Sequence, residues 1–389
     1  RHRRDRCRTA HTVKESDFMN RKPDRLLSLD ALRGWIIALM ALDHANHFIA
    51  QQHSSGEYWG GAFPVYQDTL AFLTRFITHL SAPGFFFLMG TALLLFAHAR
   101  KQQGWGQWAI IRHFMLRGGL LMALQLLIIN RAWELSPSGW GLDIYIGVLF
   151  ALGGTMIMAS LMLWLKPKYL LALTVVFFLA TELLTPNPHQ WNQSFSITQQ
   201  LLWIPGGNLN LWVNYPVLPW LKLVTFGMLF GHWIVSNPRL AFKRALWLGI
   251  TFLLAFGALR ALDGFGNIRP RADNTWIAFL NVVKYPPSLT FTLLTTGINL
   301  IILWLLNQFG DKLRYLRQPL AVFGQVPLLF YVSHLFLYAA LGLWFTPHGT
   351  SLPIMYLYWL AGLAILYPLC LGYGRFKQQQ SANSIWRFL

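Results

Sequence analysis

The sequence of 389 residues is poor in charge, in acidic side chains and in cysteine. Charged residues make up 12% of it, about half the fraction of a typical soluble chain. Its 14 Asp and Glu against 32 Lys and Arg leave a net charge of +18. This excess does not indicate a nucleic-acid-binding protein, because such proteins carry their basic face on a polar domain. The two cysteines, Cys7 and Cys370, exclude a disulfide framework and a cysteine-based zinc site.

Apolar residues make up 55% of the chain and come in blocks of about twenty, which is the length that a helix needs to cross a bilayer. We therefore predict an all-α, polytopic integral membrane protein with about ten transmembrane helices. The predicted spans cover residues 28–49, 70–98, 110–130, 144–165, 168–185, 216–235, 244–262, 286–307, 319–343 and 355–374. Pro83 and Gly84 predict a kink or a tilt in the second span, and Lys166 to Lys168 predict a tight turn after the fourth.

The basic residues predict the orientation, since cytoplasmic loops carry an excess of Lys and Arg. With the N-terminus in the cytoplasm, 24 of the 32 cations lie on the cytoplasmic side, five on the outer side and three within spans. Both termini are therefore expected to be cytoplasmic. Four of the five outer cations share the loop 260–285, which predicts either a binding loop or a structured loop paired through Asp263 and Asp273. The outer loop 186–215 is rich in Trp, Asn, Gln and Pro, which is typical of sugar or lipid recognition or of membrane anchoring.

The predicted membrane domain covers residues 26–377, between a basic N-terminal tail, residues 1–25, and a short C-terminal tail, residues 378–389. The first methionine is Met19, and no apolar segment follows within the first 25 residues, so a signal peptide is not predicted. We expect residues 1–18 to be an upstream translated or added leader, with a native basic tail as the alternative. The expected location is the cell membrane.

The first span carries ionisable side chains, which cost about 2.5–3.5 kcal/mol each on insertion scales and therefore normally face a cavity. At about 100° per residue, Asp30, Arg33, His44 and His47 fall on one stripe of a helix, with Asp43 on its flank. Arg33 and His44 are about 16 Å apart along the axis, which predicts Arg33 near the cytoplasmic side and His44 in the outer half. The alternative is structural: an Asp30–Arg33 ion pair and a hydrogen-bonded core histidine.

Other spans bring polar groups to a similar depth. Arg75 and His79 lie in the outer third of the second span, and His334 lies in the outer half of the ninth. Lys284 and Tyr285 stand at the outer mouth of the eighth span. We predict a site in this outer half, argued from depth alone. Three histidines at one depth could hold zinc, but nothing in the sequence brings them into one coordination sphere, so no metal is expected.

Four segments resemble bacterial membrane proteins of the heparan-alpha-glucosaminide N-acetyltransferase family. They are SLDALRGWIIALMALDHANHF, TRFITHLSAPGFFFLMGTA, NVVKYPPSLTF and GQVPLLFYVSHLFLY, and the similarity runs from about Leu26 to the end of the tenth span. The spacing Arg33-x10-His44 is also similar to the R-x10-H signature of related membrane O-acyltransferases. The resemblance implies ten or eleven spans and transfer of an acyl group from cytoplasmic acyl-CoA to a glycan hydroxyl or amine beyond the membrane.

The resemblance also implies roles for individual residues. In the lysosomal member of the family the functional histidine lies in the outer loop beyond the position of His44, where this chain has His47 and His53. We assign the catalytic role to His44 by its spacing from Arg33 and keep His47 and His53 in reserve. The candidate catalytic residues are His44, Asp43, His79 and His334. The candidate acyl-CoA-binding residues are Asp30, Arg33, Arg112 and Arg117, and the candidate acceptor-binding residues are His47, Arg75, Lys284 and Tyr285.

The mechanistic hypothesis places CoA phosphates on the arginines at the inner mouth, since guanidinium groups bind phosphate in a bidentate manner. His44, polarised by Asp43 or by His79, takes the proton from the acceptor as it attacks the thioester, and a covalent acyl-histidine is the variant. A donor from Arg75, His79 or His334 stabilises the oxyanion. The expected co-substrate is acetyl-CoA or another acyl-CoA.

Two rival functions fit the same composition. In a proton-coupled transporter or flippase of a polar substrate, the buried His, Asp and Arg side chains would relay protons or gate the substrate. In a structural membrane subunit, the loop 186–215 would make contacts. For the acyltransferase, the expected partners are the lipid bilayer and a glycan or lipid-linked sugar acceptor, without nucleic acid, and a homodimer is one candidate assembly.

Overall fold

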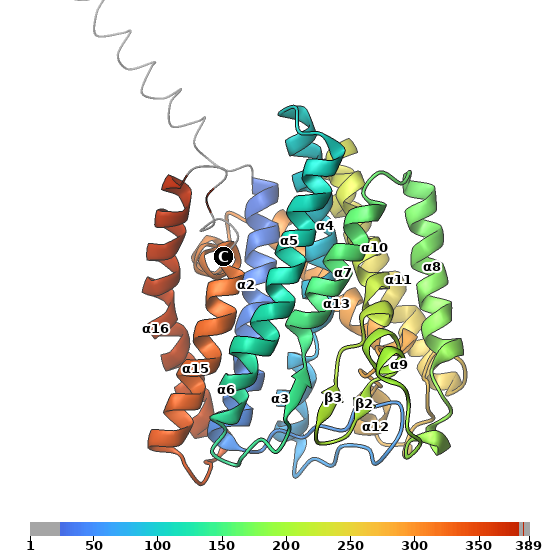
Figure 1. Ribbon diagram of the computed structural model, residues 1–389, viewed down its shortest axis with the longest axis vertical. Helices are drawn as coiled ribbons and strands as arrows, with labels where there is room; N and C mark the ends of the chain where they lie inside the picture. Colours follow the sequence, from blue (N-terminus) through green and yellow to red (C-terminus); the bar gives the residue numbers. More distant parts are fainter. Residues whose placement is uncertain (1–23, 381–383, 385–389) are drawn as a thin grey trace, which may run out of the picture.

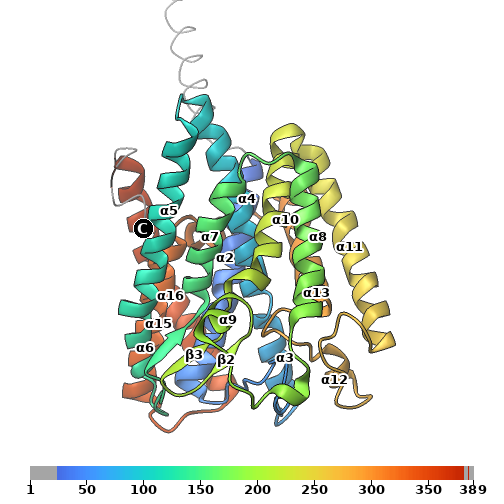
Figure 2. The same ribbon diagram turned by 45° about the vertical axis from the view of Figure 1, so that its right-hand side comes forward.

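The computed structural model describes residues 24–380 and Ser384, which form a bundle of long helices (Figures 1 and 2). The predicted leader and most of both tails lie outside the described residues. The helices are α2 (Asp24–Ala45), α3 (Thr69–Thr78), α4 (Ser81–Gln102), α5 (Gln107–Leu124), α6 (Asn130–Glu134), α7 (Val148–Met162), α8 (Pro167–Leu184), α9 (Ile197–Leu202), α10 (Val217–Ser236), α11 (Pro238–Leu262), α12 (Trp276–Leu280), α13 (Leu289–Gln308), α14 (Arg314–Gln325), α15 (Pro327–Phe345) and α16 (Leu352–Gln379). The π-helical turns η1 (Asn46–Ala50) and η2 (Gln125–Ile129) extend α2 and α5, and a 3-10 turn, η3 (Pro188–Gln190), precedes α9.

Eight helical segments within the described residues are long and apolar enough to cross a membrane. The prediction of an all-α, polytopic membrane protein is therefore confirmed. The two other predicted spans coincide with α2, which carries Asp30, Arg33 and Asp43, and with α7, an apolar helix of 15 residues. The crossing of the membrane by these two helices remains a prediction.

Two predicted spans have different bounds in the structure. The prediction of one helix over 319–343 is wrong, because Val326 separates α14 from α15 and Pro327 begins α15. Proline lacks a backbone donor and clashes with the preceding turn, so it starts a helix more readily than it continues one. In the second span the break lies at His79, between α3 and α4, and Pro83 occupies the first turn of α4, where its missing N–H has no helical partner to lose.

The start of α2 and the end of α16 lie at the same end of the bundle (Figure 1). We call this the inner end, because the Lys and Arg distribution predicts that it faces the cytoplasm, and the opposite end the outer end. The outer end carries a small sheet (Figure 2), in which β3 (Leu211–Val213) pairs with β1 (Ile144–Ile146) in parallel and with β2 (Gly206–Gly207) antiparallel. The predicted fourth span thus begins as a strand, and its helix starts only at α7.

The basic outer loop 260–285 is held by its own hydrogen bonds. The Arg260 guanidinium donates to three backbone carbonyl oxygens within residues 278–281 and lies 3.7 Å from the Asp263 carboxylate. Arg271 lies 3.5 Å from the same carboxylate. Of the two interpretations of this loop, the structure favours a structured loop, although Asp273 accepts from the backbone N–H of Thr275 instead of pairing with a cation.

Helices α2 and α14 approach closely because a glycine on each helix faces the other. A Cβ atom on Gly34 would overlap the carbonyl oxygen of Leu320, and one on Gly324 would overlap that of Asp30. The close contact brings the Gly324 carbonyl oxygen within 2.8 Å of the Arg33 guanidinium, which donates to it. The packing of these two helices therefore fixes the position of Arg33 inside the bundle.

Candidate active site

A cavity of about 470 Å³ lies at the outer end of the bundle, bounded by the end of α2, by η1, by the sheet and by the loops 51–68 and 281–288. Its walls are aromatic and polar. They carry His44, His47, His53, Trp133, Trp140, Trp212, Tyr58, Tyr145, Tyr215, Tyr285 and Tyr331, together with Asp43, Ser55, Arg75 and Asn214. Small-molecule sites commonly combine such aromatic walls with a few polar groups. We call this the outer cavity.

The structure brings His44 and His334 into direct contact at this cavity. The Nδ1 atom of His44 lies 2.7 Å from the Nε2 atom of His334, and the two rings are stacked with centroids 4.9 Å apart. His334 is fully buried, two turns into α15, whereas His44 lines the cavity wall. The sequence placed His44, His79 and His334 at a similar depth, and the structure brings His44 and His334 into contact.

The hydrogen bonds of His334 assign the protons of both rings. The Nδ1 atom of His334 lies 2.8 Å from the carbonyl oxygen of Phe330, and a carbonyl can only accept, so this nitrogen carries the proton. In a neutral imidazole the other nitrogen then accepts, and Nε2 of His334 accepts from Nδ1–H of His44. The Nε2 atom of His44 is left with its lone pair, which makes it the basic nitrogen of the pair.

Arg75 is the centre of a buried network of ionisable groups beside the histidine pair. Its guanidinium donates to both carboxylate oxygens of Glu57, at 2.7 and 2.9 Å, and to the Asp43 carboxylate at 2.7 Å. Asp43 also accepts from the Thr78 hydroxyl at 2.8 Å and lies 3.3 Å from His53. Both carboxylates are thus paired with one arginine, and Asp43 is directed toward Arg75 instead of polarising His44.

His79 does not reach His44, contrary to the prediction that it helps to polarise that ring. Its Nε2 atom lies 3.2 Å from the Glu57 carboxylate, and its ring packs edge-on against Phe291. Glu57 is fully buried, and although burial raises its pKa, the Arg75 charge holds that pKa well below its usual range. His79 therefore lies behind the charge network, away from the cavity wall.

The loop that contains Lys284 and Tyr285 is tied to the loop that contains Glu57. The backbone N–H groups of Lys284 and Tyr285 donate to the Glu57 carbonyl oxygen, and the Trp59 N–H donates to the Tyr285 carbonyl oxygen at 2.8 Å. Burial, with the Arg75 charge beside it, lowers the pKa of Lys284 to about 8. Tyr285 lines the outer cavity, whereas Lys284 lies buried behind its ring, 5.1 Å from the centroid.

The wall of the outer cavity around His47 is aromatic. The rings of Trp133 and Trp140 are stacked with centroids 4.9 Å apart, and the His47 ring packs edge-on against Trp133 at 4.9 Å. The Nε2 atom of His47 lies 3.2 Å from the Ser136 hydroxyl. On the far wall, the Tyr58 hydroxyl bonds to the amide of Asn214. Aromatic rings and amides are the groups that the loop 186–215 was expected to offer a ligand, and Trp212, Asn214 and Tyr215 of that loop line the cavity.

A second cavity, of about 300 Å³, lies toward the inner end between α2, α4, α5, α7 and α15, and we call it the inner cavity. Its walls are mostly apolar, and its cations are Arg33, Arg117 and Lys377. Arg33 forms an ion pair with Asp30 at 3.0 Å, which is the contact that the structural alternative predicted. Arg112, which was predicted to act with Arg117, is exposed on α5 and is not among the lining residues. The five residues from Arg112 to Arg117 rotate the side-chain direction by about 140° around the α5 axis, so Arg112 and Arg117 face different directions.

Sequence reasoning missed several residues at these two cavities. Glu57 is one of only two acids in the loop between the first two predicted spans, with Asp68, and no pattern identified Arg75 as its partner. Trp133 and Trp140 follow the third span and were outside the predicted site. Among the described residues, no group of three His, Cys, Asp or Glu side chains is arranged to hold a metal ion.

Residues 25–262, more than half of the chain, match the family model of heparan-alpha-glucosaminide N-acetyltransferase, catalytic. The human heparan-alpha-glucosaminide N-acetyltransferase is 28% identical over 147 residues, which are 37% of this chain and 20% of the human protein. The match therefore spans about a fifth of the length of that relative.

Proposed function

The chain belongs to the heparan-alpha-glucosaminide N-acetyltransferase family, a family of membrane acetyltransferases, and from this premise we propose that it transfers an acyl group across the membrane. The proposed donor is cytoplasmic acetyl-CoA, or another acyl-CoA, and the proposed acceptor is a hydroxyl or amine of a glycan or lipid-linked sugar at the outer end. The observation that carries the proposal is the His44–His334 pair, whose basic nitrogen stands at a cavity that meets a second, cation-bearing cavity.

The inner cavity supports the donor half of the proposal. CoA combines phosphate groups with a long, thin arm that ends in the thioester. Arg33, Arg117 and Lys377 supply the positive charge that phosphates require, and the apolar walls suit the arm. In this arrangement the phosphates stay at the inner end while the thioester reaches the boundary with the outer cavity. The contact of Arg33 with Asp30 and Gly324 positions it for this role.

The histidine pair supports the transfer step. The Nε2 atom of His44 takes the proton from the acceptor hydroxyl while the hydroxyl oxygen attacks the thioester carbonyl carbon. The carbon–sulfur bond then breaks, the acyl group stays on the acceptor oxygen, and the CoA thiolate takes the proton back from His44. His334 does not touch the reacting atoms in this scheme. It holds the His44 ring and its tautomer, the task that an aspartate performs in a serine protease.

The outer cavity supports a sugar as the acceptor. A sugar ring has apolar C–H faces that stack on aromatic rings and a hydroxyl edge that bonds to polar side chains. The stacked Trp133 and Trp140 rings offer an aromatic surface for the apolar face of the sugar. The hydroxyl groups of Tyr58 and Tyr145, with the Asn214 amide, offer polar groups for its hydroxyl edge. The Asp43 carboxylate is already paired with Arg75, so the wall favours an acceptor without strong charge.

The test uses purified protein in lipid nanodiscs with acetyl-CoA and with glucosamine and N-acetylglucosamine glycosides as probe acceptors. We expect CoA binding and acceptor-dependent release of free thiol, and we expect His44→Ala to bind CoA but to release thiol only at the background rate. The matched control is His232→Ala, since His232 on α10 is not among the residues lining either cavity.

Failure to bind CoA, together with absence of thioester turnover, would overturn the acyltransferase proposal. Proton-coupled uptake of a polar substrate into proteoliposomes by the same preparation would then favour the rival transporter, in which the His44, Asp43 and Arg75 side chains relay protons.

A further inference from the structure

The outer and inner cavities meet at Tyr331. Of the residues that line the outer cavity in the described part of the chain, Tyr331 and Val148 also line the inner cavity. Val148 is the first residue of α7, and Tyr331 lies in the second turn of α15. These two side chains therefore separate the cavity that contains His44 from the cavity that contains Arg33.

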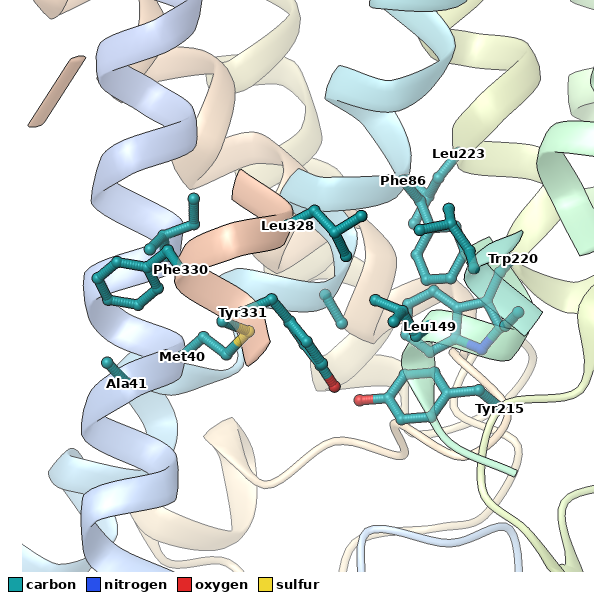
Figure 3. Packing of buried hydrophobic residues seen from close by; sticks show 14 of the residues in the cluster. Met40, Ala41, Phe86, Leu149, Tyr215, Trp220, Leu223, Leu328, Phe330 and Tyr331 are labelled. Atoms are coloured by element: carbon teal, nitrogen blue, oxygen red, sulfur yellow. The ribbon is translucent and has the colours of Figure 1, made fainter. Parts of the chain in front are cut away.

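The Tyr331 side chain is fixed in this position by its neighbours. Only 6% of the residue is exposed, and its ring packs edge-on against that of His334, with centroids 5.7 Å apart. Figure 3 shows the Tyr331 and Tyr215 side chains pointing toward one another with their hydroxyl groups leading. A ring attached to α15 thus extends toward the Tyr215 wall of the outer cavity.

The position of this ring constrains any group that passes from one cavity to the other. Tyr331 precedes His334 by three residues, so both side chains leave α15 on the same face. A thioester carbonyl that approaches His44 from the inner cavity therefore passes the Tyr331 ring. An acyl chain longer than acetyl would need the space that the ring occupies.

We propose that Tyr331 is a specificity-determining residue that restricts the transferred group to a short acyl chain, with acetyl as the best fit. This inference rests on the proposed function. The ring acts through its volume and its rigid packing against His334, and no bond to its hydroxyl forms or breaks during transfer. The Val148 side chain completes the partition from the side of α7.

The experiment measures thiol release from acetyl-CoA, butyryl-CoA and octanoyl-CoA, with water as the acceptor, in nanodiscs. We expect Tyr331→Leu to raise the ratio of kcat/KM for butyryl-CoA to that for acetyl-CoA by at least about tenfold, since pockets discriminate one methylene group by roughly 10- to 200-fold. Val148→Ala opens the same partition from α7 and should shift the ratio in the same direction. Tyr331→Phe keeps the ring and should keep the wild-type ratio.

The matched control is Tyr338→Leu. Tyr338 is a buried tyrosine two turns further along α15, its hydroxyl donates to the Trp359 carbonyl oxygen at 2.9 Å, and it is not among the residues lining either cavity. An unchanged ratio in both Tyr331→Leu and Val148→Ala, or an equal change in Tyr338→Leu, would overturn the inference. A wild-type protein that turns over no acyl-CoA would instead overturn the proposed function, so the two failures are distinguishable.

Discussion

The Nδ1 atom of His44 lies 2.7 Å from the Nε2 atom of His334, and this contact joins residues that are 290 positions apart in the sequence. His334 donates its own Nδ1–H to the Phe330 carbonyl oxygen within α15. A rigid helix thus determines which nitrogen of His44 is basic, through a single intervening ring. The arrangement needs no carboxylate on either ring, since both acids of the region, Asp43 and Glu57, are paired with Arg75.

The first prediction separates the two histidines by their roles. We expect His44→Ala to lower kcat by about 10³-fold, because it removes the base that acts on the acceptor. His334→Ala should lower kcat by a smaller factor, because His44 remains but loses its fixed tautomer. Steady-state thiol release measures both. If His334 takes the proton itself, the two variants will instead show equal losses.

The second prediction concerns the stability of the charge network. Arg75→Met leaves Asp43 and Glu57 without their cation, and breaking such a buried pair typically costs about 3–5 kcal/mol of unfolding free energy. Thermal unfolding in detergent should show a large decrease in melting temperature. Arg131→Met is the control, because the Arg131–Glu134 pair is exposed at the outer end and should leave the melting temperature unchanged.

A double variant makes this prediction sharper. Glu57→Gln combined with Arg75→Met removes a partner from each side of the network, so its destabilisation should be smaller than the sum of the two single effects. Additive effects would show that the two side chains do not stabilise each other, contrary to the bidentate geometry of the pair.

The third prediction is a pH dependence of stability that arises from Lys284. Its pKa in the folded protein is about 8, against 10.5 for an ordinary lysine, because the side chain is buried and lies near Arg75. Between these two values the unfolded chain binds more protons than the folded protein, so the free energy of unfolding rises with pH. The destabilising effect is complete below pH 8 and is lost above about pH 10.5.

The variant Lys284→Met isolates this effect. Relative to the variant, the wild-type protein should gain about 3 kcal/mol of unfolding free energy as the pH rises from 8 to 10.5, since one pKa unit corresponds to about 1.4 kcal/mol. Chemical or thermal unfolding of both proteins across that range provides the measurement. A difference that does not vary with pH would contradict the lowered pKa.

The sequence allowed the class of fold to be predicted because bilayer insertion depends on local composition. Apolar blocks of about twenty residues identified the helices, and the charged side chains Asp30, Arg33 and Asp43 within α2 predicted a functional site there. Helix breaks were harder to predict. Pro327 begins α15 and so divides a predicted span, whereas Pro83 is accommodated in the first turn of α4, because the effect of a proline depends on its position within the helix.

The site could be predicted to the level of depth and no further. Helical geometry gives the height and the face of His44 and of His334, but their contact depends on how α2 and α15 rotate against each other, which is a tertiary property. Arg112 shows the same limit, since a count of cations near the inner mouth does not say which of them faces the cavity. Glu57 was missed because a loop has no periodicity from which a side-chain direction can be read.

The fourth prediction tests the link between helix packing and donor binding. Gly324→Ala places a methyl group where the Asp30 carbonyl oxygen of α2 lies, so α2 and α14 must separate. Overpacking of this kind typically costs about 1–3 kcal/mol of unfolding free energy. The separation also lengthens the hydrogen bond from Arg33 to the Gly324 carbonyl oxygen, which is 2.8 Å in the wild-type protein.

We therefore expect Gly324→Ala to lower the melting temperature and also to weaken CoA binding by about tenfold, the effect of about 1.4 kcal/mol at a displaced phosphate-binding arginine. Isothermal titration of CoA into the nanodisc-embedded protein provides the second measurement. The control is Gly372→Ala on α16, where an added Cβ atom meets nothing within 4 Å. This control should retain wild-type CoA affinity, because the added methyl group displaces nothing. It should not lower the stability, because alanine is a better helix former than glycine. Normal CoA affinity in Gly324→Ala, despite a lowered melting temperature, would show that Arg33 does not depend on this helix contact for donor binding.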